Sequence, residues 1–110
     1  MNQVGLPADR ILEARRGALR TLCRRCHVRR LDLFGSALTD HFDVARSDFD
    51  MLVTFDDLAP GPYADAYFAL KQGLEDLLGH DVDLVTTPTL ENPYFRREVE
   101  AHRKTLFSAA

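Results

Sequence analysis

Residues 31–55, LDLFGSALTDHFDVARSDFDMLVTF, contain two apolar segments that are joined by a polar loop. The first segment ends in Gly35-Ser36, and the second begins with Asp48-Phe49-Asp50 inside an apolar run. Because side chains alternate across a strand, Asp48 and Asp50 would lie on the same face, one pleat apart. Two neighbouring carboxylates repel each other unless a cation is present. The stretch therefore predicts two strands, the second of which carries a pair of acids that needs a cation.

The same stretch indicates which ligand would bind together with the cation. Mg²⁺ takes oxygen ligands, usually one or two carboxylates together with substrate phosphates. A Gly-Ser turn after a strand offers backbone N–H groups and a hydroxyl to phosphates. Gly35-Ser36 and the pair Asp48 and Asp50 therefore fit one ligand, a nucleoside triphosphate that is bound with its metal.

The sequence also resembles a known family, the minimal nucleotidyltransferases of the DNA polymerase β superfamily, and particularly its small prokaryotic antitoxin-type members. The matching fragments lie between residues 28 and 107 and are Leu33-Phe34-Gly35-Ser36, Ser47-Asp48-Phe49-Asp50-Met51-Leu52-Val53, Val82-Asp83-Leu84-Val85 and Asn92-Pro93-Tyr94-Phe95. The resemblance implies an α+β fold, in which helices pack on a small mixed β-sheet.

This resemblance implies a third acid, Asp83, which joins Asp48 and Asp50 as a catalytic residue and as a ligand of two Mg²⁺ ions. Asp81 would lie on the same face of its strand, so the pattern alone does not choose between Asp81 and Asp83. The resemblance favours Asp83, because the matching element is Val82-Asp83-Leu84-Val85.

The nucleotide-binding residues that we expect are Gly35, Ser36 and Arg46. Gly35 and Ser36 would hold the β- and γ-phosphates of ATP. Family members often have Arg-Gly shortly after the serine, whereas this chain has Leu38-Thr39-Asp40. Arg46 lies next to the acids and is the nearest substitute for contacting the triphosphate.

The function that the resemblance implies is an enzymatic one in a toxin–antitoxin system. The chain would transfer a nucleoside monophosphate, AMP, from ATP to a protein hydroxyl and so neutralise a HEPN-domain ribonuclease toxin, with which it could form a hetero-oligomer. A chain of 110 residues leaves no room for a separate substrate domain, which favours a protein acceptor. The alternatives are a non-catalytic antitoxin that inhibits its partner by binding, and a small-molecule (antibiotic) nucleotidyltransferase.

Length and composition indicate one globular domain over residues 1–110, with 45% hydrophobic and 28% charged residues. No apolar run approaches the ~20 residues of a membrane helix, and no signal-peptide core is present, so we expect a cytoplasmic protein. Eight arginines and two acids give residues 1–30 a charge of +6, whereas residues 31–110 carry −9. The arginine-rich start is either a docking surface for an acidic partner or a solvated helix face. We do not expect nucleic-acid binding, because no aromatic residues interleave with these arginines.

Periodicity predicts the remaining elements. We expect a helix over Asp9–His27, a strand over Arg30–Phe34, a helical turn and loop within 37–47, and a strand over Asp48–Phe55. A helix over Tyr63–Leu78 and a strand over Val82–Thr86 should follow. The last expected helix starts at Asn92, and its inner stripe consists of Phe95, Val99, His102 and Leu106. Ala59-Pro60-Gly61-Pro62 is expected to lie outside any helix or strand.

Cys23-Arg24-Arg25-Cys26-His27 has the spacing of a c-type haem attachment motif and of half a zinc site. Haem attachment needs export, and zinc needs a second ligand pair, whereas the chain has only these two cysteines. We therefore expect Cys23 and Cys26 to be reduced and packed on the inner side of the first helix.

Overall fold

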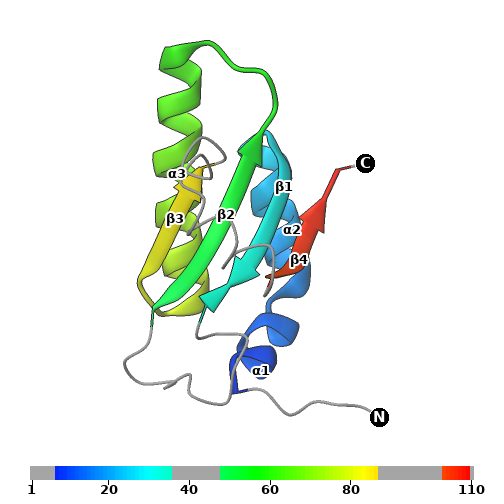
Figure 1. Cartoon of the computed structure of the whole chain (residues 1–110). Helices are drawn as coiled ribbons and strands as arrows, with labels where there is room; N and C mark the ends of the chain where they lie inside the picture. The colour runs from blue at the N-terminus through cyan, green and yellow to red at the C-terminus, as the bar shows by residue number, and fades with distance from the viewer. Residues whose placement is uncertain (1–6, 36–47, 87–102, 110) are drawn as a thin grey trace.

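The computed structural model describes residues 7–35, 48–86 and 103–109. These residues form helices and strands (Figure 1). In chain order they are α1 (Pro7–Ala14), α2 (Arg16–Arg25), β1 (Val28–Phe34), β2 (Phe49–Phe55), α3 (Pro60–Leu78), β3 (Val82–Thr86) and β4 (Arg103–Ser108). The helical turn expected within 37–47 and the start of the last helix at Asn92 lie outside the described residues.

The strands form one mixed sheet in the order β3-β2-β1-β4. β2 and β3 run parallel, and β1 runs antiparallel to both β2 and β4. The long helix α3 lies between β2 and β3 along the chain and so makes the crossover that a parallel pair requires. The α+β fold with a mixed sheet is confirmed.

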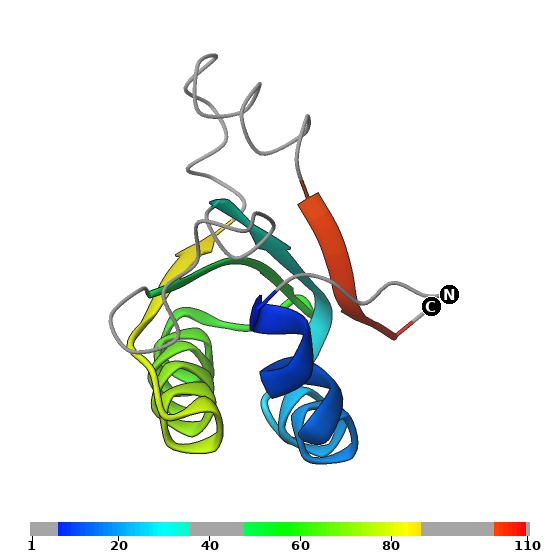
Figure 2. The ribbon, with the colours of Figure 1, turned by 90° about the horizontal axis from the view of Figure 1, so that it is seen from below.

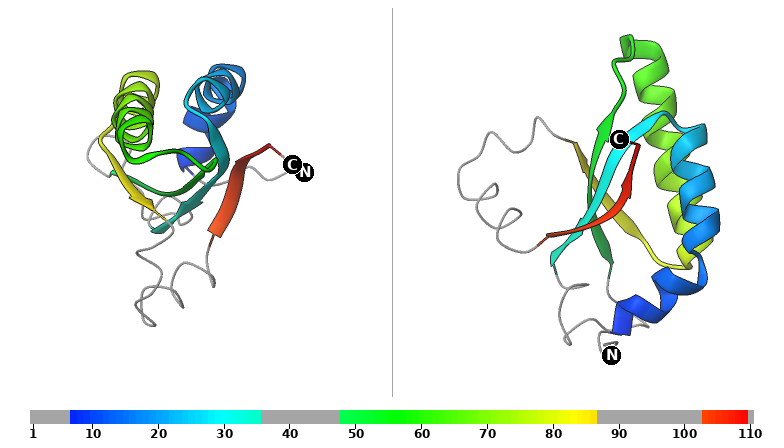
Figure 3. Two further views of the ribbon diagram at one scale, coloured as in Figure 1. Left: turned by 90° about the horizontal axis from the view of Figure 1, so that it is seen from above. Right: turned by 90° about the vertical axis from the view of Figure 1, so that its right-hand side faces the viewer.

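All three helices of the described chain pack on the same face of the sheet (Figures 2 and 3). The core lies between these two layers, where alternate strand residues meet the inner stripes of α2 and α3. Its fully buried members include Cys23, Leu31, Leu33, Met51, Val53, Leu70 and Leu74. The opposite face of the sheet carries a small separate cluster of Phe34, Leu52 and the partly buried Val85. Among the described residues, no helix is long and apolar enough to cross a membrane.

The expected first helix is two helices, because the backbone leaves helical geometry at Arg15. The guanidinium Nε of Arg15 donates a hydrogen bond of 2.6 Å to the carbonyl oxygen of Leu77 on α3. Its Nη1 donates to the carbonyl oxygen of Ile11, at 3.3 Å. The break between α1 and α2 thus comes with a link to α3 that helical periodicity could not indicate.

The start of α3 also differs from the expectation. Pro60 and Pro62 lie inside the helix, in its first turn, rather than in a break before Tyr63. Proline is tolerated there because the first N–H groups of a helix have no partner within the helix. The expected end is confirmed: Gly79 adopts a left-handed conformation with φ of 70°, and its N–H donates to the carbonyl oxygen of Glu75 at 2.9 Å.

The last predicted helix is wrong in its C-terminal part, because Arg103–Ser108 is a strand. This segment pairs with β1, where Leu31 lies opposite Phe107 and Phe34 lies opposite Arg103. The backbone of β1 would otherwise have unpaired N–H and C=O groups along this edge. The pairing therefore overrides a helical spacing that was compatible with Leu106 on an apolar stripe.

Cys23 and Cys26 are free and buried, as expected. Burial, together with a smaller effect of the nearby Cys26, raises the pKa of the Cys23 thiol to about 12. Burial also raises the pKa of Cys26. Because only the thiolate is nucleophilic, we expect neither thiol to react quickly with a disulfide reagent near neutral pH in the native protein. Both should react at once in denaturant. Fast native labelling of Cys23 would contradict this packing.

Candidate active site

The candidate acids lie on the face of the sheet that the helices leave free. Asp50 on β2 is in register with Asp83 on β3, and Phe34 on β1 is in register with Asp50. Residues that pair across strands project from the same face of a sheet. Asp48 precedes β2 by one residue. The acids therefore gather at the edge where β1 ends and where β2 and β3 begin (Figure 1).

The charges of the other two acids act on the carboxylate of Asp50. Asp50 is half-buried, whereas Asp48 and Asp83 are exposed. Burial raises the pKa of Asp50, and the negative charges of Asp83 and then Asp48 raise it further. A bound cation would remove both penalties, since it neutralises the repulsion and replaces lost hydration. Asp50 is therefore the acid of the three whose ionised form a bound cation would stabilise most directly.

Gly35 brings the backbone of the chain directly against Asp50. It follows the last residue of β1 and has a φ of +76°, in the left-handed region that glycine adopts without strain. A Cβ atom at this position would overlap Oδ2 of Asp50 and would lie 3.2 Å from both its Cβ and its Cγ. The space beside the Asp50 carboxylate thus exists only because residue 35 has no side chain. Ser36 and Arg46, the other expected nucleotide-binding residues, lie outside the described residues.

The donor set at this edge fits Mg²⁺ in its chemistry. Within the part of the chain that the structure describes, no group of three or more His, Cys, Asp or Glu side chains forms a ready-made metal site. Mg²⁺ is usually held through one or two carboxylates, waters and the phosphates of a substrate, so a closed protein cage is not required. The repelling carboxylates of Asp50 and its neighbours, and the cradle at Gly35 that a Cβ would fill, suit an ion that arrives with the nucleotide.

Asp81 and Asp83, between which the sequence did not choose, act on different neighbours. The charge of Asp83 raises the pKa of Asp50. The pKa of Lys71 on α3 is raised mainly by its hydrogen bond to Glu75, and the charge of Asp81 is a smaller cause. Of the two, Asp83 is the acid that lies in register with Asp50 and whose charge acts on Asp50.

One charged cluster on the same face was missed by the sequence interpretation. Asp32 on β1 is 1% exposed, and both of its carboxylate oxygens have cationic partners. Its Oδ1 accepts a hydrogen bond of 3.0 Å from Nε of Arg30, and its Oδ2 forms an ion pair of 3.1 Å with Nη2 of Arg103. The signal was present, because Asp32 precedes Phe34 by two residues and interrupts an apolar strand. Arg103 was missed because the sequence analysis placed it in a helix.

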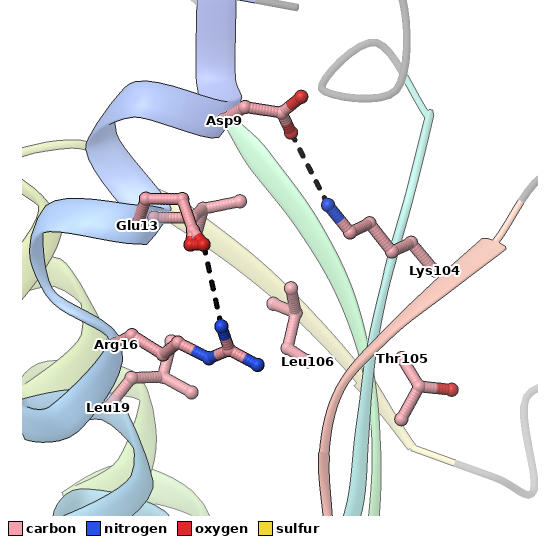
Figure 4. Close-up of a pocket in the computed structure, with 8 residues that line it drawn as sticks. Asp9, Glu13, Arg16, Leu19, Lys104, Thr105 and Leu106 are labelled. Carbon is pink, nitrogen blue, oxygen red and sulfur yellow. Dashed lines mark ion pairs between the residues drawn. The ribbon is translucent and has the colours of Figure 1, made fainter. Parts of the chain in front are cut away.

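A cavity of about 170 Å³ lies elsewhere, between α1, α2 and β4 (Figure 4). Its charged residues pair with one another: Lys104 Nζ lies 3.5 Å from Oδ1 of Asp9, and Arg16 Nη1 lies 3.5 Å from Oε1 of Glu13. This cavity contains none of the candidate acids, and its charges are balanced internally. The ion pair between Lys104 and Asp9 links β4 to α1. The cavity is separate from the candidate active site.

Comparisons with known proteins find relatives of this chain in sequence and in fold. Residues 15–106 match the nucleotidyltransferase domain family. A Methanocaldococcus jannaschii protein named "putative protein adenylyltransferase" is 34% identical over 73 residues, which is 66% of this chain and 71% of that protein. A solved "putative minimal nucleotidyltransferase" has a TM-score of 0.70 and 32% identity, and the match covers 93% of this chain and 98% of that one. A solved toxin–antitoxin with AMP-PNP has a TM-score of 0.59 and 26% identity, with coverages of 86% and 73%.

Proposed function

The chain belongs to the nucleotidyltransferase domain family, and on that premise we propose that it transfers AMP from ATP to a protein hydroxyl in the presence of Mg²⁺. The observation that carries the proposal is the juxtaposition of Asp50, Asp83 and the backbone of Gly35 at one edge of the free sheet face. The similarity to a protein adenylyltransferase supports the choice of AMP and of a protein acceptor. The similarity to a structure with AMP-PNP supports ATP as the donor.

In this proposal, different residues of the chain bind the metal ions, the acceptor hydroxyl and the phosphates. Asp48, Asp50 and Asp83 would hold two Mg²⁺ ions, which when bound stabilise charge on the attacking and leaving oxygens. Asp83, the exposed acid on β3, would also orient the acceptor hydroxyl. Backbone N–H groups at Gly35 and Ser36 would hold the phosphates that leave as pyrophosphate. In our proposal, Arg46 contacts the same phosphates.

We further propose that the acceptor is a toxin of the HEPN-domain class, which the chain neutralises as an antitoxin. The similarity to solved toxin–antitoxin structures supports a toxin as the partner. The helices α1 and α2 offer a surface for an acidic region of such a partner, because their exposed arginines are Arg10, Arg16, Arg20, Arg24 and Arg25. Docking there would leave the free face of the sheet open to ATP, since the helices cover the opposite face.

The test is transfer of label from ATP to the proposed toxin partner, for which the product of the adjacent gene is the candidate. We expect label on the partner when ATP is labelled at the α-phosphate, and none when it is labelled at the γ-phosphate, because the γ-phosphate leaves with pyrophosphate. Chelation of Mg²⁺ should abolish labelling. Transfer of the γ-phosphate instead would contradict the proposal and indicate a kinase.

Acid variants separate the proposal from its alternatives. Asp48→Ala and Asp83→Ala should abolish labelling and neutralisation together, whereas Asp81→Ala is the matched control and should preserve both. Neutralisation that survives the first two variants without any label would indicate a non-catalytic antitoxin. Label on a small hydroxyl compound, and none on the protein, would indicate a small-molecule nucleotidyltransferase.

A further inference from the structure

Arg103 on β4 lies in the same cross-strand row as the candidate acids. It is in register with Phe34, Phe34 is in register with Asp50, and Asp50 is in register with Asp83. Since neighbouring strands are about 4.8 Å apart, the backbones of Arg103 and Asp50 are separated by about 10 Å. At one level of the sheet the strands thus carry Arg103 at one end, Asp50 and Asp83 at the other, and Phe34 between them.

The buried carboxylate of Asp32 holds Arg103 on this face. The ion pair between Oδ2 of Asp32 and Nη2 of Arg103 is 3.1 Å long, and the Arg103 side chain remains 24% exposed. A guanidinium has five N–H donors, so this contact leaves donors for a further ligand. Because the contact restricts the rotamers of a long side chain, less conformational entropy is lost when a second anion binds.

Arg30 shares Asp32 but is placed differently. It lies opposite Thr54 and Ser108, farther along β1 from Gly35 than the row that contains Arg103. Its Nε donates to Asp32, and its Nη2 donates to the hydroxyl of Thr105 at 3.1 Å. The two arginines therefore neutralise the same carboxylate, while only Arg103 is level with the acids and adjacent to the residue that precedes Gly35.

We propose that Arg103, positioned by Asp32, binds the β- and γ-phosphates of the nucleotide at the Gly35 edge of the sheet. The assignment rests on the proposed function, since it names a further phosphate ligand for the same site. A magnesium-bound nucleoside triphosphate keeps a net negative charge, and a guanidinium matches phosphate oxygens in a bidentate manner. The acids and Arg103 then serve opposite ends of one ligand: carboxylates for the metal, and the guanidinium for phosphate oxygens.

The test compares Arg103→Gln with Arg30→Gln, because each variant removes one cation from Asp32. Calorimetry without any acceptor measures the affinity for Mg–ATP and for AMP. We expect Arg103→Gln to weaken Mg–ATP binding about tenfold, the usual cost of a charge-assisted hydrogen bond. The preference for ATP over AMP should fall by the same factor, since AMP lacks the two outer phosphates. Arg30→Gln should leave both unchanged, and Arg103→Lys should recover part of the affinity.

Thermal denaturation of each variant separates binding from folding. If Arg103→Gln fails to fold because Asp32 loses a partner, the double variant D32N/R103Q removes the unbalanced charge and should show the same loss of ATP preference. Equal effects of Arg103→Gln and Arg30→Gln, or an unchanged ATP preference in Arg103→Gln, would show that Arg103 only neutralises Asp32. Wild-type protein that binds no Mg–ATP at all would overturn the proposed function, and this assignment with it.

Discussion

Replacing Asp50 by Asn is expected to lower the rate of AMP transfer by about 10³-fold or more, because preorganised charge stabilisation supplies most of the acceleration in such a reaction. Asp50 is the central acid of the site. It is in register with Asp83, and its pKa is raised by the charges of both Asp83 and Asp48. Asparagine keeps the shape of the side chain but removes the charge that would bind the metal. The measurement is kcat with α-labelled ATP.

The same substitution should not destabilise the protein in the absence of nucleotide. Burial and two like charges disfavour the ionised Asp50 side chain in the folded state, so a neutral amide removes an unfavourable interaction. We expect the melting temperature of Asp50→Asn to equal or exceed that of the wild type. Mg–ATP should raise the melting temperature of the wild type but not that of Asp50→Asn, because a ligand stabilises the state that binds it.

Asp81→Asn is the matched control, because Asp81 is an exposed acid two residues from Asp83 whose charge acts on Lys71. It should retain transfer and the response to Mg–ATP. An Asp50→Asn protein that transfers AMP at nearly the wild-type rate would show that Asp50 is not required for the reaction. A large fall in its melting temperature would mean that Asp50 has a structural role instead.

The strands that carry the acids were predictable, because their signal is local. Alternation over 49–55 places Asp50 opposite the core-facing Met51, and the observed strand begins at Phe49. The parallel partner Val82–Thr86 was predicted with its observed bounds. Two apolar strands that carry acids near their first residues imply, when parallel, that these acids meet at one edge. The sheet part of the site therefore follows from periodicity and the family resemblance.

The features that were not predicted depend on contacts between distant residues. Strand Arg103–Ser108 forms because β1 has a free edge, and nothing in the six residues of β4 alone outweighs a helical spacing. That error also concealed Arg103, whose partner Asp32 lies 71 positions earlier in the chain. The break at Arg15 is likewise accompanied by a hydrogen bond to a carbonyl group on α3. Sequence periodicity contains no information about such partners.

The contact between Gly35 and Asp50 also joins two residues that are distant in the sequence. Replacing Gly35 by Ala should destabilise the fold and disable the site together. The left-handed backbone at φ +76° costs a residue with a Cβ roughly 1–2 kcal/mol. The added Cβ would also overlap Oδ2 of Asp50, so that carboxylate must move away from its place in the row. A displacement of about 1 Å in a reacting group typically costs about 10²-fold in rate.

Gly79 provides the control that separates strain from displacement. It has nearly the same backbone angle, φ +70°, but a Cβ there would meet no atom within 4 Å. Gly79→Ala should therefore lose stability to a similar extent, measured by chemical denaturation, and should keep its kcat. Gly35→Ala should lose stability by more than this and also lose about 10²-fold in kcat at a temperature where both variants are folded. Equal kcat in the two variants would mean that residue 35 acts only through backbone strain, and that its approach to Asp50 has no part in the reaction.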